Sequence, residues 1–235
     1  MEQAIKELIE HTNQKLSTLP PGNRLLISVS GIPGSGKTTL AKKVSEGLNA
    51  ISKSGEVAAM IPMDGYHLTR AALSAMADPI EAHARRGAPF TFDPVSLKLL
   101  IERVKAPLGG EGGEKIIYAP SFDHAVKDPV ENDIKILSSQ RVLIFEGNYL
   151  SMGTDVWGDI ARLFDELWFV EVDRGVARER LIARHLKAGL ADTREAAAKR
   201  ADENDLPNGD YLVANGLKPH RVILSVEDQD YARGG

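Results

Sequence analysis

Residues 31–39, with the sequence GIPGSGKTT, have the spacing G-x-x-x-x-G-K-[ST] of a loop that cradles phosphate groups. The glycines allow the backbone to curl so that its N–H groups face inward, and Lys37 adds positive charge. An apolar run at 25–30 precedes this segment, and apolar residues at helical spacing follow it. The order strand, loop and helix predicts a site for a nucleotide polyphosphate, in which Thr38 offers its hydroxyl to Mg²⁺. The candidate nucleotide-binding residues are Gly31, Pro33, Gly34, Ser35, Gly36, Lys37, Thr38 and Thr39.

Two carboxylates follow apolar runs further along the chain. Asp64 comes after the run at 56–61, and Glu146 ends the run at 142–145. Ligands of open parallel sheets bind beyond the carboxyl ends of the strands, so both side chains are candidates for chemistry. Asp64 is predicted to take the proton from an acceptor hydroxyl, and Glu146 to orient Mg²⁺ directly or through water. The alternatives are that Asp64 belongs to an ordinary Asp-Gly turn and that Glu146 is a structural carboxylate.

A cluster of arginines follows in residues 174–187. Phosphoryl transfer places negative charge on oxygens that a metal ion and one lysine do not fully cover, so kinases commonly supply arginines. A helix here places Arg180, Arg184 and Lys187 on one face, with Arg178 near its edge. Gly189 is expected to end this helix, and Asp192 with Glu195 to form the capping box of the next one. We therefore predict a closing lid over about 174–204, although a solvated basic face explains each arginine equally well. The candidate catalytic residues are Lys37, Asp64, Arg178, Arg180 and Arg184.

The acceptor is expected to bind to two segments around this centre, an insertion at about 65–93 and residues 118–124. They combine cations, aromatic rings, a carboxylate and imidazoles, which could bind a polyol or a heterocycle. The alternatives are that Phe90 and Phe92 are core residues, that Arg86 ends a solvated helix, and that His124 is a hydrogen-bonded loop residue. The spacing of the histidines does not match a zinc site. The candidate substrate-binding residues are Tyr66, His67, Arg86, Phe92, Tyr118, Asp123 and His124.

The elements that must position these residues alternate along the chain. Strand-like runs are predicted at 25–30, 56–61, 115–118, 142–145, 167–172 and 221–224, with helical segments between them. Asp93 and Pro94 are predicted to start one of the helices, with an apolar stripe at Leu97, Leu100, Ile101 and Val104. The alternation predicts an α/β fold with right-handed crossovers around a mostly parallel sheet. A flexible connector is expected at 107–113.

Bulk composition narrows the class of protein. The chain has 235 residues, of which 43% are hydrophobic, and a single domain over 1–235 is the simplest interpretation. The net charge of −4 gives no global attraction to nucleic acid or to anionic lipid, which favours a small ligand. The chain has no cysteine, which excludes disulfides, and it has no apolar run or signal core of the kind that membrane insertion or secretion needs. A cytoplasmic protein without nucleic-acid or membrane partners is expected, and a homodimer is possible.

The motifs occur in an order that resembles the phosphoribulokinase/uridine kinase family of P-loop kinases. They are the loop at 31–39, DGYH at 64–67, RGAPFTFD at 86–93, FDH at 122–124 and FEG at 145–147, and the resemblance covers about 25–226. The segment after Asp64 is most similar to the pantothenate kinase-like branch and its uncharacterised fungal and bacterial relatives. The resemblance implies a three-layer α/β/α P-loop NTPase sandwich with a five-stranded, mostly parallel core sheet and a helical lid.

The same resemblance implies ATP and Mg²⁺ as cofactors and a small-molecule hydroxyl as the acceptor, in a nucleoside, a pantothenate-like compound or a sugar. It places the base on Asp64, the phosphate lysine on Lys37, metal-organising roles on Thr38 and Glu146, and lid arginines at 178–184. Tyr66-His67 and the segment 206–210 fit neither uridine kinase nor pantothenate kinase closely, so the substrate is not transferred from either. Asn208 and residues 215–219 are candidates for contacts with the nucleotide base.

An ATP-dependent small-molecule kinase is the leading hypothesis from these features. The alternative is a nucleotide-dependent switch or regulatory NTPase that has no small-molecule acceptor. An Asn-Lys-x-Asp motif is absent from the sequence, which counts against a guanine-specific switch. A third hypothesis is a structural protein that binds ATP without turnover.

Overall fold

The computed structural model describes residues 2–53, 55–108, 116–123 and 125–225. Its main sheet has five parallel strands in the order β2-β5-β1-β6-β7. These strands are β1 (Leu25–Gly31), β2 (Ala58–Pro62), β5 (Val142–Glu146), β6 (Glu166–Glu171) and β7 (Arg221–Leu224). All residues of β1 and β5 are buried, as expected for central strands that are covered on both faces. The predicted parallel core sheet is confirmed.

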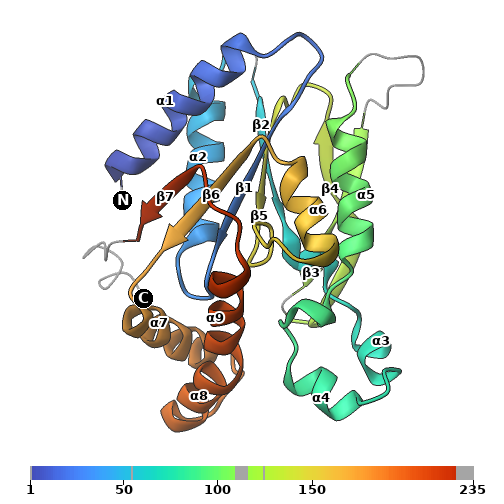
Figure 1. Cartoon of the computed structure of the whole chain (residues 1–235), viewed down its shortest axis with the longest axis vertical. Coiled ribbons are helices and arrows are strands. Elements are labelled where there is room, and N and C mark those ends of the chain that lie inside the picture. Colours follow the sequence, from blue (N-terminus) through green and yellow to red (C-terminus); the bar gives the residue numbers. More distant parts are fainter. Residues whose placement is uncertain (1, 54, 109–115, 124, 226–235) are drawn as a thin grey trace.

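Helices cover both faces of this sheet (Figure 1). α1 (Glu2–Thr18) and α2 (Lys37–Ile51) lie on one face, and α5 (Pro94–Lys105) and α6 (Asp155–Leu163) lie on the other. Alternate residues of the strands point to opposite faces, so Ile27 and Val29 pack with α1 and α2 whereas Leu26 packs with α5 and α6. The arrangement is the expected α/β/α sandwich with a buried layer on each side of the sheet.

The strand predicted at 115–118 does not join this sheet. Residues Ile116–Asp123 form β3, which pairs antiparallel with β4 (Asp128–Leu137) in a separate two-stranded sheet. The expectation that strands alternate with helices throughout is therefore wrong here, and residues 121–123 belong to a strand rather than a loop. β4 escaped prediction because its sequence, DPVENDIKIL, is largely polar and lacks the apolar run of a core strand. Most of the connector predicted at 107–113, and His124, lie outside the described residues.

Two groups of short helices lie beyond the carboxyl ends of the strands (Figure 1). The insertion between β2 and α5 contains the 3₁₀ turn η1 (Met63–Tyr66), α3 (Arg70–Ser74), α4 (Pro79–Ala84) and the 3₁₀ turn η2 (Pro89–Thr91). The second group contains α7 (Arg174–Lys187), α8 (Arg194–Arg200), the π-helical turn η3 (Ala201–Asp205) and α9 (Leu206–Asn215). Residues 174–204 of this group are the predicted lid, and its helices enclose a small apolar cluster of their own around Leu181, Ile182 and Leu206.

The ends of the lid helices agree only in part with those predicted from the sequence. Gly189 has a φ of +61° and follows α7 closely, as expected of a helix-ending glycine. The N-cap of α8 is Thr193, whose hydroxyl accepts a hydrogen bond from the N–H of Ala196. The capping box predicted for Asp192 and Glu195 is therefore wrong by one residue, because a threonine directly after an aspartate offers a second cap. In the part of the chain that is described, no helix combines the length and apolarity needed to cross a bilayer.

Asp93 allows a direct test of how the N-terminus of α5 is stabilised. Its carboxylate accepts hydrogen bonds from the N–H (3.0 Å) and the hydroxyl (2.6 Å) of Ser96. Asp93→Ala leaves the N–H without its cap and is expected to lower the free energy of unfolding by about 1 kcal/mol, measured by urea denaturation. Asp93→Asn retains an acceptor and is expected to lose less. Equal stability of the alanine variant and the wild type would contradict this role.

Candidate active site

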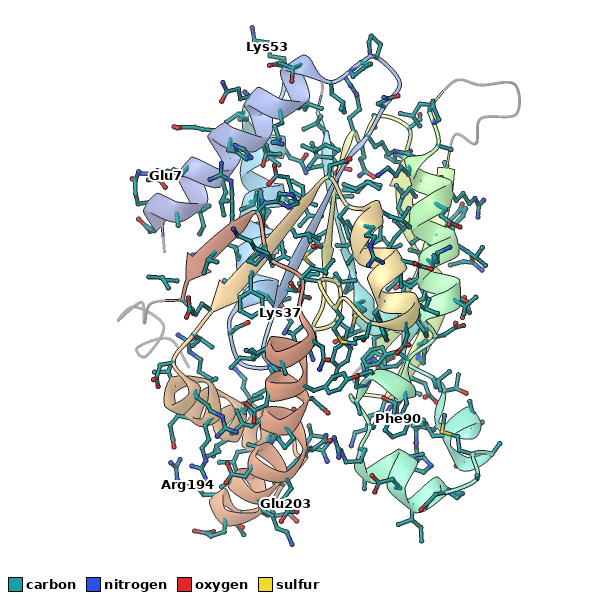
Figure 2. All side chains as sticks on the ribbon, in the orientation of Figure 1. Glu7, Lys37, Lys53, Phe90, Arg194 and Glu203 are labelled. Carbon is teal, nitrogen blue, oxygen red and sulfur yellow. The ribbon has the colours of Figure 1, made fainter. Side chains whose placement is uncertain are left out.

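The pairing of three neighbouring strands brings the predicted site together. β5 lies between β2 and β1, and Glu146 at the end of β5 pairs with Pro62 of β2 and with Val29 of β1. Asp64 lies two residues beyond Pro62, and the cradle (residues 31–39) begins two residues beyond Val29. The two carboxylates and the glycine-rich loop therefore meet at one edge of the sheet. Figure 2 shows Lys37 at this edge, near the middle of the molecule.

The cradle has the backbone shape that its glycines predict. Gly34 has a φ of +82°, and a Cβ atom there would lie 2.7 Å from the carbonyl oxygen of Ala177 in α7. Any other residue at 34 would be strained and would also push the lid away. Gly36 is the N-cap of α2, whose first-turn N–H groups have no acceptor within the helix and point toward the loop. A helix N-terminus beneath a curled, positively charged loop is suited to bind phosphate oxygens.

Lys37 and Glu146 form a buried pair at the base of the cradle. The ammonium nitrogen of Lys37 lies 3.9 Å from Oε1 of Glu146, and both side chains are buried. Burial raises the pKa of Glu146 to about 7, against the opposing effects of the Lys37 charge and of a hydrogen bond from the Thr38 hydroxyl. Burial also lowers the pKa of Lys37, while the charges of Glu146 and Asp64 act in the opposite direction. Each charge thus reduces the cost of burying the other.

Asp64 differs from Glu146 in its exposure. Its side chain in η1 is 49% exposed, and Oδ1 lies 3.9 Å from Nδ1 of His67. Gly65 leaves no room for a side chain, since a Cβ atom there would overlap the carbonyl oxygen of Pro120 in β3. The Asp-Gly pair therefore forms a turn, as the structural alternative stated, but this turn is fixed by β3 and places its carboxylate beside the Lys37–Glu146 pair.

The lid arginines divide into two groups. Arg180 donates hydrogen bonds to the carbonyl oxygen of Gly34 (3.3 Å) and to Oγ of Ser225 (2.9 Å), so it lies against the cradle. Arg184 is close enough for its charge to act on both Lys37 and Glu146. Arg178 instead binds both carboxylate oxygens of Asp202 at 2.7 Å, within the lid. The structure thus brings Arg180 and Arg184 to the predicted site but does not bring Arg178 there.

The predicted acceptor residues are also divided. Tyr66, His67 and Tyr118 line one cavity of about 450 Å³ beside the sheet edge. Phe92 is only 4% exposed and belongs to the apolar core, where it packs against the His67 ring, as its structural alternative stated. Asp123 accepts hydrogen bonds from the N–H groups of Ala125 and Val126 and so builds the turn between β3 and β4. Arg86 donates hydrogen bonds to the carbonyl oxygen of Lys127 and to Asp128, next to this turn. His124 lies outside the described residues.

Sequence reasoning missed a hydrogen-bonded link between the insertion and the segment that follows α8. Arg85 donates to the side-chain oxygens of Asn204 (3.2 Å) and Asn208 (3.1 Å), and Asn204 donates to the carbonyl oxygen of Arg86 (3.1 Å). Asn208, a candidate for contact with the nucleotide base, is 3% exposed and faces the insertion instead. The partners lie more than a hundred residues apart in the sequence, and no local pattern signals such a contact.

The donors at the sheet edge fit a magnesium ion. They are the hydroxyl of Thr38 and the carboxylate of Glu146, both hard oxygen ligands. Among the described residues, no group of three or more histidine or carboxylate side chains is arranged to hold a metal ion alone. Mg²⁺ suits such an incomplete set, because it retains water molecules and shares its coordination with substrate phosphates.

The pattern of the Phosphoribulokinase / Uridine kinase family matches residues 26–194, which include the cradle, both carboxylates and the first lid helix. This chain belongs to that family. A P-loop kinase of this family uses ATP and acts on a small molecule, and the fold described above matches those of solved P-loop kinases. The specific substrate does not follow from membership.

Two curated relatives are similar over most of their length. "ATP-dependent kinase-like protein notR'" of Aspergillus versicolor is 45% identical over 161 residues, which cover 68% of this chain and 92% of the relative. "Putative uridine kinase C227.14" of Schizosaccharomyces pombe is 39% identical over 211 residues, which cover 90% of this chain and 87% of the relative. Both names describe kinases, in agreement with the family.

Two solved structures resemble the whole chain. The first, described as a "putative fructose transport system kinase" from Silicibacter sp. TM1040, has a TM-score of 0.78 and 31% identity and covers 92% of this chain and 98% of its own. YFH7 from Saccharomyces cerevisiae has a TM-score of 0.80 at 20% identity, and the match covers 97% of this chain and 99% of the YFH7 chain. The second likeness supports the fold alone.

The buried Glu146 predicts a pH dependence of stability in metal-free and nucleotide-free protein. Because its folded pKa of about 7 lies above its ordinary value of 4.5, the folded protein binds a proton that the unfolded chain releases between these values. The contribution of Glu146 to the free energy of unfolding therefore falls as pH rises from about 4.5 to about 7. Glu146→Gln lacks this change, so its stability relative to wild type is expected to rise through this window in urea denaturation with EDTA. The exposed Glu171→Gln is the matched control, and a parallel profile for Glu146→Gln and wild type would contradict the assignment.

The division of the lid arginines predicts unequal effects on ATP binding. Arg180→Gln removes a positive charge that touches the cradle and is expected to weaken ATP binding about tenfold, the size of one charge-assisted hydrogen bond. Arg178→Gln removes a charge that Asp202 already neutralises and is expected to change the affinity by less than about twofold. Isothermal titration calorimetry with Mg–ATP compares the two variants. Equal losses of affinity would refute the division.

Proposed function

We propose that this chain transfers the γ-phosphate of ATP to a hydroxyl group of a small metabolite. The observation that carries the proposal is the half-exposed carboxylate of Asp64 beside the buried Lys37–Glu146 pair, at the same sheet edge as the cradle. A proton acceptor next to a phosphate site is what an alcohol needs to attack a phosphoryl group.

The environments of the two carboxylates support different roles for them. Glu146 is buried, accepts a hydrogen bond from Thr38 and faces Lys37, so an incoming alcohol has little access to it. Asp64 is open on about half of its surface and is held by a turn that packs against β3. Asp64 therefore serves as the general base, and Glu146 with Thr38 holds the metal side of the site.

The remaining groups act on the phosphate chain. The cradle N–H groups and Lys37 bind the phosphate oxygens, and Arg180 and Arg184 add positive charge from the lid. Thr38 and Glu146 would hold Mg²⁺, which would neutralise part of the phosphate charge. Asp64 takes the proton of the acceptor hydroxyl while the hydroxyl oxygen forms a bond to the γ-phosphorus. The bond between the γ-phosphorus and the oxygen of ADP breaks, and ADP leaves with its electrons.

A panel of metabolites tests the proposal against its alternative. The protein is incubated with Mg–ATP and single hydroxyl compounds, and mass spectrometry detects the gain of one phosphate. At least one compound is expected to become phosphorylated with equal release of ADP. ADP release that no compound stimulates but that a protein partner does would instead favour a regulatory NTPase.

Replacing Asp64 tests its role as the base. Asp64→Asn keeps the shape of the side chain but cannot accept the proton, so the transfer rate is expected to fall by about 10²–10⁴-fold, while the affinity for Mg–ATP changes little. The exposed Asp159→Asn on α6 is the matched control and is expected to behave as wild type. Unchanged phosphoryl transfer by Asp64→Asn on the acceptor found above would exclude Asp64 as the base.

A further inference from the structure

A second cavity of about 450 Å³ lies between the insertion, the β3–β4 turn and the lid, and its charged lining is entirely basic. Arg70 and Arg86 line it from the insertion, Lys127 from the turn, and Arg200 from the end of α8. Within the described residues no carboxylate lines this cavity. The chain as a whole carries a net charge of −4, so four cations around one cavity are a local feature and not a result of composition.

Most of these cations lack the carboxylate partners that other arginines of the lid have. Arg178 pairs with Asp202 and Arg194 pairs with Glu179, whereas no ion pair to a described residue is formed by Arg70, Lys127 or Arg200. The Nε atoms of Arg86 and Arg200 are buried and have no hydrogen-bond acceptor in the described part of the chain. A buried N–H without an acceptor is costly, so Arg86 and Arg200 each carry one donor that no described residue satisfies.

The wall formed by Arg86 is rigid. Its guanidinium donates to the carbonyl oxygens of Lys127 (2.6 Å) and Leu68 (3.0 Å) and to Oδ1 of Asp128 (3.2 Å). Its Cζ atom lies 5.5 Å from the centre of the Phe122 ring. Arg86 is thus neutralised in part by Asp128 and held in one position, which leaves the other three cations to supply net positive charge.

Neighbouring elements position the backbone of Lys127 and of Arg200 at the cavity. The turn built by Asp123 carries Lys127, which adopts a left-handed φ of +63° at its end. Asn204, four residues after Arg200, is bonded to Arg85 and to the backbone of Arg86. The lid and the insertion therefore meet beside the cavity, and Arg200 is presented to it from the lid.

A row of rings leads from this cavity to the proposed base. Oδ1 of Asp64 lies 3.9 Å from His67, whose ring centre lies 4.9 Å from that of Phe122, and Phe122 lies beneath Arg86. These contacts connect the proposed base to the wall of the cavity that Arg86 forms.

We propose that the basic cavity binds a phosphate or carboxylate group of the acceptor while the acceptor hydroxyl lies at Asp64. This inference rests on the proposed transfer to a hydroxyl and adds the class of acceptor: a hydroxy acid or a sugar phosphate, and not a neutral polyol or nucleoside. Arginine pairs with both anions in a bidentate manner, so the cavity suits their shared chemistry.

Anion binding can be tested without knowledge of the acceptor. The cradle is first filled with a saturating non-hydrolysable ATP analogue and Mg²⁺, and inorganic phosphate or malonate is then titrated by calorimetry. Saturable binding is expected, and Arg70→Gln and Arg200→Gln are each expected to raise the dissociation constant about tenfold. Lys199→Gln, an equal change of charge on the exposed side of α8, is expected to bind as wild type. Absence of saturable binding, or equal binding by Arg200→Gln and Lys199→Gln, would overturn the inference.

Matched acceptors separate this inference from the proposed function. Each set contains a neutral polyol, its phosphate monoester and the corresponding hydroxy acid, assayed with Mg–ATP. Turnover of the anionic members alone, with a KM that Arg200→Gln raises more than it lowers kcat, supports both proposals and shows which anion is preferred. Equal turnover of the neutral members refutes the anion site and leaves hydroxyl transfer standing. Loss of phosphate binding in Arg200→Gln without turnover of any member supports the anion site and contradicts hydroxyl transfer.

Discussion

The pairing of β2, β5 and β1 is the constraint on which the site depends. Parallel strands end at the same edge of a sheet, so a loop after β1, a carboxylate after β2 and a carboxylate at the end of β5 meet without long connections. The buried pair of Lys37 and Glu146 lies at this junction. At 3.9 Å the pair is loose, and the donors of the ammonium group remain available to phosphate oxygens while its charge is still compensated.

The insertion and the lid face this edge and are joined by η3. This single π-helical turn contains Asn204, which bonds to the insertion, and Asp205, which lies 3.8 Å from Arg184 and 3.2 Å from His185 of α7. The turn thus contacts the insertion through one residue and Arg184 of the lid through the next. Such turns are rare in proteins, and those that occur are often found at functional sites. There they redirect side chains that a regular helix would point elsewhere.

Features that depend on short stretches of sequence were predictable. The strand, loop and helix of the cradle, the Asp93 cap and the apolar stripe of α5 are set by neighbouring residues, and the described structure contains each of them. β4 was not predictable because its polar sequence has no apolar run. The basic cavity was missed for another reason: Arg70, Lys127 and Arg200 lie in separate segments, and only tertiary contacts such as that of Asn204 bring them together. Sequence patterns therefore revealed the phosphate side more fully than the acceptor side.

The β3–β4 hairpin connects these two sides. Gly65 is fixed by the carbonyl oxygen of Pro120, so the position of Asp64 depends on β3, and the same strand carries Phe122 and Asp123 toward the basic cavity. A shift of the hairpin would move the proposed base and the wall of the cavity together. β3 therefore contacts both the turn that holds Asp64 and, through Phe122, the Arg86 wall of the cavity.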